Sequence, residues 1–484
     1  MDKGLKKQVV TGVAWKYAER MLAQIISTVV AIVLARILDP AHYGIISIVN
    51  VFITICNVFV VCGLGESLVQ KKDADELDFS SIFYINVGLS IILYLILFIC
   101  APMIERFYGD SYSDLALIIR IMGLRLILAA VNSIQNARVS REMDFKKYFW
   151  VTLFGTLLSA FVGIYMAVSG FGVWALVAQY MTNSTVDTVM LFIFVKWRPH
   201  LMFSIKRAKP LIKYGSRIVA VSAIDTVYDE LRSLIIGKKY SADDLAFYTK
   251  GETYPKLVVN NFNSALASVL FPAFSKVQDD REAMKRLLKR SITTSSYFIF
   301  PAMIGLFVVA EQFVSVLLTD KWLPCVPYLR MMCVVFMLTP MAQPSNQCLT
   351  ASGNSGLYAK TGLIKKVFGV ALLLLSFKYG VICIAVTQVI SNIFDYVVSV
   401  ITGGRIIQYG IKQQLRDLMP HFIMAVIMGG VVWCVGKLLN GCQSLYILII
   451  EILVGIIVYI VASVITKDET FFMFFRVIRK KRKK

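Results

Sequence analysis

Apolar residues along this chain come in blocks of about 20, separated by short polar breaks. A block of that length crosses a hydrocarbon core of about 30 Å as a helix, whereas a membrane β-barrel shows short alternating segments. Lipid offers the backbone no hydrogen-bond partner, so each block predicts a transmembrane helix. The predicted spans are residues 11–38, 43–69, 79–104, 114–137, 147–168, 171–195, 214–237, 245–271, 292–318, 325–350, 357–377, 380–402, 419–438 and 444–466.

The composition agrees with this pattern. Of the 484 residues, 57% are hydrophobic and 17% are charged, whereas soluble domains are about 45–50% apolar and about 25% charged. The predicted fold is therefore an all-α polytopic membrane protein of about 14 transmembrane helices.

Basic residues are distributed unequally between the two sides of the membrane. Alternate connections and both termini hold 35 Lys and Arg residues, and the remaining connections hold 7. The positive-inside rule therefore predicts that both termini are cytoplasmic. The formal charge of +21 is explained by this topology, so we expect no nucleic-acid partner. The basic tail over residues 467–484 is expected to lie against anionic lipid.

The two halves of the chain resemble each other at an offset of about 210 residues. Each half has six spans, so both copies share one orientation and are related by a pseudo-two-fold axis along the membrane normal. Matching pairs are Asp110 and Asp320, Arg120 and Arg330, Met122 and Met332, Asn136 and Asn346, Gln179 and Gln388, and Asn183 and Asn392. The predicted parts are an N-terminal six-helix lobe (1–195), a cytoplasmic linker (196–213), a C-terminal six-helix lobe (214–404), two additional helices (405–466) and the basic tail (467–484).

Several charged and amide side chains fall inside the predicted spans at helical spacing. Lys16, Arg20 and Gln24 share one face of the first span. A charge at the bilayer centre costs at least ~2.5–3.5 kcal/mol, so such residues face a wet cavity, pair with acids or reach the interface. We interpret them as lining a cleft between the lobes. The candidate substrate-binding residues are Lys16, Arg20, Asn50, Asn57, Arg125, Arg217, Arg232, Lys250, Lys256 and Asn260.

A basic cleft within a membrane suits a large anion, because guanidinium groups bind phosphate oxygens through paired donors. Local pairing is the alternative for some of these residues, such as Arg232 with Asp229 or Lys256 with Glu252.

Asp225, Asp229, Asn392 and Asp395 are candidate ligands for a coupling sodium ion or proton, since oxygen atoms suit a hard cation. Helix packing is an equal alternative for these four residues. The three His and nine Cys residues show no metal-ligand spacing, so we expect no metal site and no cofactor.

Several segments carry a resemblance to a known family. The stretches Ala35–Pro40, Gly63–Gln70 and Ser140–Lys146, with Tyr43-Gly44, are similar to those of Wzx-type polysaccharide flippases. The segment Ser140–Lys146 resembles the colanic-acid and teichuronic-acid exporter branch of the multidrug/oligosaccharidyl-lipid/polysaccharide exporter superfamily.

The resemblance implies twelve core helices in two lobes with two extra helices. It implies transfer of undecaprenyl-diphosphate-linked repeat units across the bacterial cytoplasmic membrane by alternating access, for lipopolysaccharide or exopolysaccharide biosynthesis, alongside a polymerase or ligase. Related lipid flippases place arginines from the first spans in the cleft, which supports Arg20 as a substrate-binding residue. Related flippases with a sodium site use acids of the eleventh span, where this chain has Lys365 and Lys366.

Three other classes stay open. A multidrug exporter of the same superfamily is disfavoured by Lys16 and Arg20 in the first span. A membrane polymerase or ligase would need an acid/base constellation on an outer loop, and every outer connection is short. A membrane scaffold would leave the buried charge without a purpose. We therefore expect a transporter and not an enzyme.

Overall fold

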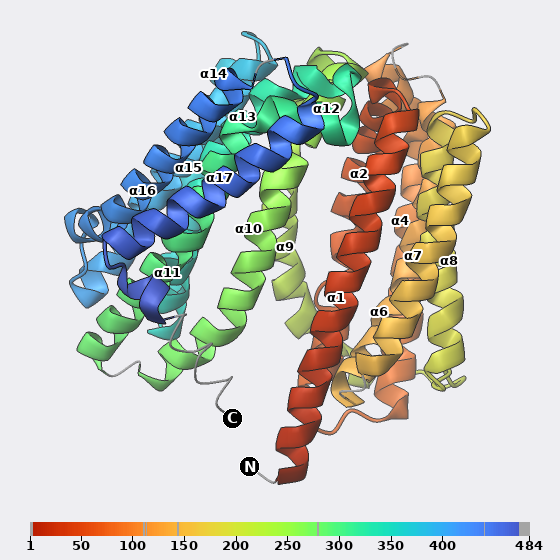
Figure 1. The fold of residues 1–484 in the computed structure, drawn as a ribbon. Coiled ribbons are helices and arrows are strands. Elements are labelled where there is room, and N and C mark those ends of the chain that lie inside the picture. Colours follow the sequence, from red (N-terminus) through yellow and green to blue (C-terminus); the bar gives the residue numbers. More distant parts are fainter. Residues whose placement is uncertain are drawn as a thin grey trace. The chain divides into compact units, whose positions relative to one another are not determined.

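The computed structural model describes residues 3–109, 112, 114–142, 145–277, 280–439 and 441–473. Within these ranges every regular element is a helix, and each predicted span coincides with one or two helices (Figure 1). The predicted all-α architecture is confirmed. The helices are α1 (Lys3–Ile37), α2 (Pro40–Val61), α3 (Leu64–Gln70), α4 (Glu76–Tyr108), α5 (Leu115–Gly123), α6 (Arg125–Glu142), α7 (Phe145–Val168), α8 (Val173–Phe194), α9 (Ile205–Lys239), α10 (Ala242–Lys276), α11 (Arg281–Val308), α12 (Ala310–Leu318), η1 (Asp320–Cys325), α13 (Val326–Ala351), α14 (Ser355–Ser376), α15 (Val381–Ile407), α16 (Ile411–Leu438) and α17 (Ser444–Ile465).

Ten stretches of the described chain are long and apolar enough to cross a membrane by length and composition alone. The predicted spans outside that set are α8, α9, α10 and α14, which have 22, 35, 35 and 22 residues. A helix rises about 1.5 Å per residue, so each of these four is also long enough to cross a bilayer.

The chain divides into two compact units, Met1–Ala246 (unit 1) and Phe247–Lys484 (unit 2). The sequence placed the start of the second lobe at residue 214. In the structure, α9 packs against α2, α3 and α4, so it groups with the helices that precede it. The division into two six-helix lobes and two added helices stays a prediction.

In unit 1 the most extensive helix contacts are those of α7 with α8 and with α1, and α6 packs against α2, α4 and α8. Start signals in the sequence set the helix boundaries. Pro40 stands at the first turn of α2, where no hydrogen bond is lost. Asp75 and Asp78 form a capping box at α4, because each carboxylate accepts a hydrogen bond from the backbone N–H of the other.

At both ends of α2 a glycine lets the backbone come into direct contact with the backbone of α9 or the start of α10. A Cβ added at Gly44 would lie 1.9 Å from the carbonyl oxygen of Ala242. At the other end, Gly63 adopts a φ of 87°, and its Cβ would lie 2.4 Å from the carbonyl oxygen of Gly215. Only glycine allows approaches this close.

Unit 2 is built around α11, α13, α15 and α16, whose buried side chains form one apolar cluster with α17. The hairpin of α16 and α17 lies along this unit: α16 packs on α11, and α17 contacts α12 (Figure 1). The two additional helices expected from the sequence are therefore packed onto the rest of unit 2.

A buried histidine joins three segments of unit 2. His421 of α16 is 4% exposed. Its Nδ1 lies 2.7 Å from Ser296 Oγ of α11, and its Nε2 lies 2.8 Å from Asp468 Oδ2, just after α17. Burial raises the pKa of Asp468, but hydrogen bonds from His421 and from the backbone N–H groups of Phe471 and Thr470 outweigh it, so the pKa lies below its usual range.

We expect Asp468→Asn to lower the melting temperature by a few degrees at pH 7, because a charged hydrogen-bond acceptor is worth about 1.5–3 kcal/mol. The folded-state pKa is lowered, so this stabilisation is present above the ordinary aspartate value of about 3.9 and is lost as pH falls through the lowered value. Thermal unfolding of the purified protein between pH 7 and pH 3 tests both statements. Glu469→Gln, at an exposed neighbour, is the control, and a gap that persists at low pH contradicts the assignment.

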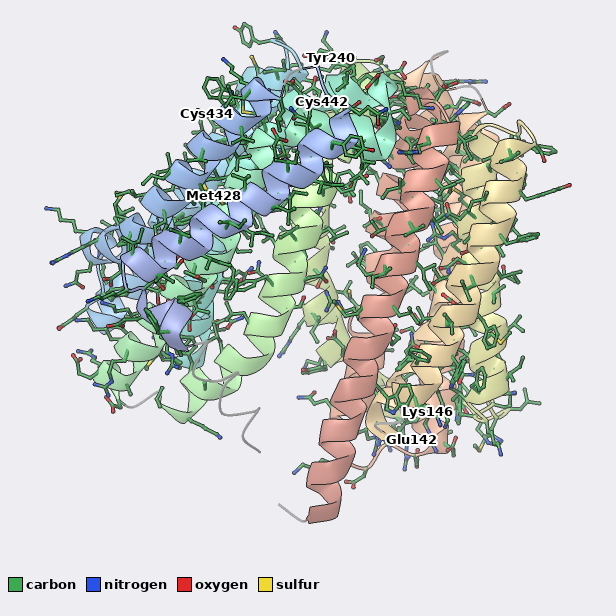
Figure 2. The ribbon with its side chains drawn as sticks, in the orientation of Figure 1. Glu142, Lys146, Tyr240, Met428, Cys434 and Cys442 are labelled. Carbon is green, nitrogen blue, oxygen red and sulfur yellow. The ribbon has the colours of Figure 1, made fainter. Side chains whose placement is uncertain are left out.

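The two ends of unit 1 differ in charge. Figure 2 shows Glu142 and Lys146 at one end of this unit and Tyr240 at the opposite end. The end that carries the connections 71–75, 138–147 and 196–209 is called the basic end below. In unit 2, Figure 2 shows Cys442, just before α17, at the end of the α16–α17 hairpin and Met428 farther along it.

Candidate functional site

Arg125 lies near mid-bilayer depth inside unit 1. It contacts Asn50, residue 11 of the 22 in α2, and Ser184, residue 12 of the 22 in α8. Each helix is about 33 Å long at 1.5 Å per residue, so both partners lie near the middle of their helices.

The contacts of Arg125 with the described residues are all with neutral groups. Its Nε donates to Ser184 Oγ at 3.1 Å, and its Nη1 donates to Asn50 Oδ1 at 3.4 Å. Its Cζ lies 4.9 Å from the centre of the Tyr180 ring, a cation–π contact. Among the residues that the structure describes, no carboxylate pairs with it. A half-buried positive charge at this depth can bind an anion that enters the unit.

Local structure places this side chain. The fourth span is interrupted at Leu124, so α5 ends at Gly123 and Arg125 is the first residue of α6. Gly123 packs against α4, where an added Cβ would lie 3.1 Å from a ring carbon of Tyr94.

Asn57 lies two turns after Asn50 on the same helix and is half-buried. Its side-chain oxygen Oδ1 is buried and accepts no hydrogen bond from any described residue. An unsatisfied amide oxygen is costly in a membrane, so this atom suits a polar ligand or a water molecule.

Tyr180 and Ser184 were not among the candidates from the sequence. They stand on α8 at i and i+4, and Asp187 follows three residues later, so the three share one face. Asp187 fits against α7, where a Cβ at Gly155 would lie 1.9 Å from its Oδ1. Beside it, Glu19 of α1 accepts a hydrogen bond from Thr152 of α7 at 3.1 Å. This polar stripe was the signal in the sequence that could have found Tyr180 and Ser184.

Of the two candidates on α1, the structure describes the side chain of Arg20 but not that of Lys16. Arg20 is exposed. The side chain of Lys16 lies outside the described part of the chain, and so does residue Asp110 of the repeat. The predicted role of Lys16 and Arg20 in binding substrate stays a prediction.

The candidates on α9 have different surroundings. Arg217, Asp225 and Asp229 are exposed. Arg232 is 8% exposed, and its Cζ lies 5.4 Å from the centre of the Tyr228 ring. Arg232 is therefore packed within the unit, and whether substrate reaches it stays a prediction.

In unit 2 the basic candidates on α10 have local partners. Lys250 is buried, with its Nζ 5.3 Å from the Trp322 ring centre. Lys256 pairs with Glu252 at 2.9 Å, as the sequence allowed. The last candidate on this helix, Asn260, is exposed.

The candidate ion ligands on α15 are Asn392 and Asp395. The Nδ2 of Asn392 donates to the Gln388 carbonyl oxygen at 3.4 Å. Asp395 interacts electrostatically with Lys365 and Lys366 of α14. In the described ranges no group of three or more His, Cys, Asp or Glu residues could hold a metal ion. Cation coupling through these residues stays a prediction.

Known proteins resemble this chain over most of its length. Lipopolysaccharide biosynthesis protein WzxC of Escherichia coli (strain K12) is 24% identical over 448 residues, which cover 90% of this chain and 89% of that protein. Teichuronic acid biosynthesis protein TuaB of Bacillus subtilis (strain 168) is 21% identical over 432 residues, 88% of each chain. These similarities confirm the resemblance to the colanic-acid and teichuronic-acid branch.

The fold is shared with a solved structure of the lipid II flippase MurJ in an inward closed conformation. The TM-score is 0.77 at 15% identity, over 94% of this chain and 99% of that one. The family described as polysaccharide biosynthesis protein matches residues 33–327, more than half of the chain. With this match and the shared fold, we place the chain among multi-pass α-helical membrane proteins, as a member of the polysaccharide biosynthesis protein family.

Proposed function

We propose that this protein is a flippase that carries undecaprenyl-diphosphate-linked oligosaccharides from the inner to the outer leaflet of the bacterial cytoplasmic membrane, for lipopolysaccharide or exopolysaccharide synthesis. The observation that carries the proposal is Arg125, a mid-bilayer cation whose described partners are all neutral. A diphosphate supplies the anion that such a charge lacks, and a guanidinium group can bind two phosphate oxygens at once.

The orientation follows from the charge distribution. With 35 basic residues at the termini and alternate connections against 7 in the others, the basic end of unit 1 and both termini face the cytoplasm. Two like-oriented bundles can open alternately to either side, so the proposed transport cycle is alternating access. In this cycle Lys16, Arg20, Arg217, Arg232, Lys250 and Lys256 are the other candidate contacts for phosphate, and Asn50, Asn57 and Asn260 are those for the glycan.

The lipid tail needs an apolar path. Unit 2 has an apolar groove of about 730 Å³ between α16 and α17. Its lining includes Met419, Ile423 and Ile427 of α16 and Ile465 of α17. These side chains are 47–74% exposed, and in a membrane they face acyl chains. The groove supports the idea that the two additional helices hold the prenyl tail.

The coupling ion belongs to the proposal as well. Asp225, Asp229, Asn392 and Asp395 remain its candidate ligands, and the lysines beside Asp395 favour a mechanism that does not use sodium there. A polymerase or ligase that uses the delivered repeat unit is the expected partner.

Reconstitution tests the proposed function. Vesicles that contain the purified protein and a labelled polyprenyl-diphosphate oligosaccharide are treated with a membrane-impermeant reagent that modifies the glycan. We expect the protein to raise the rate at which the protected glycan becomes accessible, with the recovered lipid chemically unchanged. Cleavage or extension of the glycan would indicate an enzyme. Uptake of a cationic dye without lipid movement would indicate a drug exporter.

A further inference from the structure

A cavity of about 730 Å³ lies at the basic end of unit 1, and Arg125 is not among its lining residues. It lies where the segment after α3 meets the start of α9. Half of its lining side chains are cationic, and two are apolar. The lining residues are Lys71, Ser204, Lys206, Arg207, Pro210 and Leu211.

Two of the three cations form ion pairs with carboxylates at the start of α4. Lys71 Nζ donates to Oδ2 of the fully buried Asp78 at 2.6 Å, and Arg207 Nη1 donates to Asp75. The same Nη1 lies 3.7 Å from Asp78 Oδ2. Lys206 is exposed and belongs to no ion pair with a described carboxylate. The three cations therefore exceed the two carboxylates, and the cavity has an excess of positive charge.

The start of α9 adds to this excess. No side chain caps the helix at Ser204, and its first turn contains no acid but has Lys206 and Arg207. Cations at a helix N-terminus are unfavourable, because the dipole is positive there. A bound anion would offset both the dipole and the two side chains.

The segment just before the cavity is apolar and exposed. Leu201, Phe203 and Ile205 are 97%, 56% and 61% exposed, and Met202 lies between them. Soluble surfaces rarely present such a cluster, whereas a membrane interface buries it. Apolar side chains next to basic ones are typical of a segment that lies at the boundary between headgroups and acyl chains.

We propose that this cavity binds the phosphate headgroup of an anionic phospholipid from the cytoplasmic leaflet, with its acyl chains against Leu201, Phe203 and Ile205. The inference uses the proposed orientation but not the proposed substrate. A bulk phospholipid is the assigned ligand because the cavity opens at headgroup depth, where phospholipid phosphates are the most abundant anions. The bound lipid fixes the start of α9 at the membrane surface.

The test measures binding of phosphatidylglycerol to the full-length detergent-purified protein by native mass spectrometry or lipid titration, with phosphatidylcholine as the comparison lipid. We expect preference for phosphatidylglycerol, and about fivefold weaker binding for Lys206→Gln, since one basic residue near an anionic surface is worth about 1 kcal/mol. Phe203→Ser is expected to weaken binding of both lipids. Neither exposed side chain supports the fold, so both variants should remain stable.

Lys209→Gln is the matched control: Lys209 is an exposed lysine on the same helix that does not line the cavity. Equal affinity of Lys206→Gln and Lys209→Gln overturns the site. Displacement of phosphatidylglycerol by an equimolar polyprenyl diphosphate would show that the site takes the transported lipid, and that also overturns the assignment. A protein that flips no lipid-linked sugar but loses phosphatidylglycerol binding in Lys206→Gln would leave this inference standing and reject the proposed function.

Discussion

Arg125→Ala is expected to lower lipid-linked oligosaccharide transport at least about tenfold while the protein remains folded. A hydrogen bond to a charged group is worth about 1.5–3 kcal/mol, and 1.4 kcal/mol corresponds to a factor of ten. Arg125→Lys keeps the charge but loses the forked donors, so partial activity is expected. The measurements are the flipping rate in vesicles and the amount of surface polymer in cells, each normalised to protein level.

Arg120→Ala is the control for this prediction. Arg120 precedes Arg125 by five residues, but it lies on α5 and is half-buried, with its Nε 3.3 Å from the Phe98 carbonyl oxygen and its Cζ 4.4 Å from the centre of the Phe98 ring. The Arg120→Ala variant should therefore lose little transport activity. Arg125 also joins α6 to α2 and α8, so a structural role would appear as a lower melting temperature. Normal transport by Arg125→Ala, or a loss fully explained by unfolding, would reject phosphate binding at this residue.

The helices of this protein could be read from the sequence because the membrane imposes one strong rule. Each apolar block must be a helix, and the fourteen predicted spans coincide with helices. Helical spacing also identified Asn50 and Arg125 as polar positions inside spans, and the structure brings these two side chains together.

Other features depend on which helices pack together, and one helix's own pattern does not contain that information. The polar stripe on α8 marked Ser184 as a polar position, but its hydrogen bond with Arg125 follows only from the packing of α6 against α8. The grouping of α9 with α2 likewise follows from backbone contacts between distant segments. Lys250 had the pattern of a cleft residue, yet its neighbour in the structure is Trp322 from a connection about 70 residues later.

Gly44→Ala is expected to destabilise the protein, because the new methyl group would lie 1.9 Å from the carbonyl oxygen of Ala242. That oxygen belongs to the backbone of α10 and cannot rotate away, so α2 and the start of α10 must separate. Overpacking of this kind typically costs about 1–3 kcal/mol. The expected result is a melting temperature lowered by about 1–3 °C, measured by thermal unfolding of the purified protein.

Gly88→Ala provides a control of the opposite sign. Gly88 lies within α4, and an added Cβ there would meet no atom within 4 Å. Alanine is favoured over glycine in a helix by about 1 kcal/mol, so this variant should be as stable as the natural protein or more so. If the glycine contact also joins α2 to α10 during transport, Gly44→Ala should change the flipping rate more than Gly88→Ala does. Equal melting temperatures for the two variants would show that the close approach at Gly44 does not stabilise the protein.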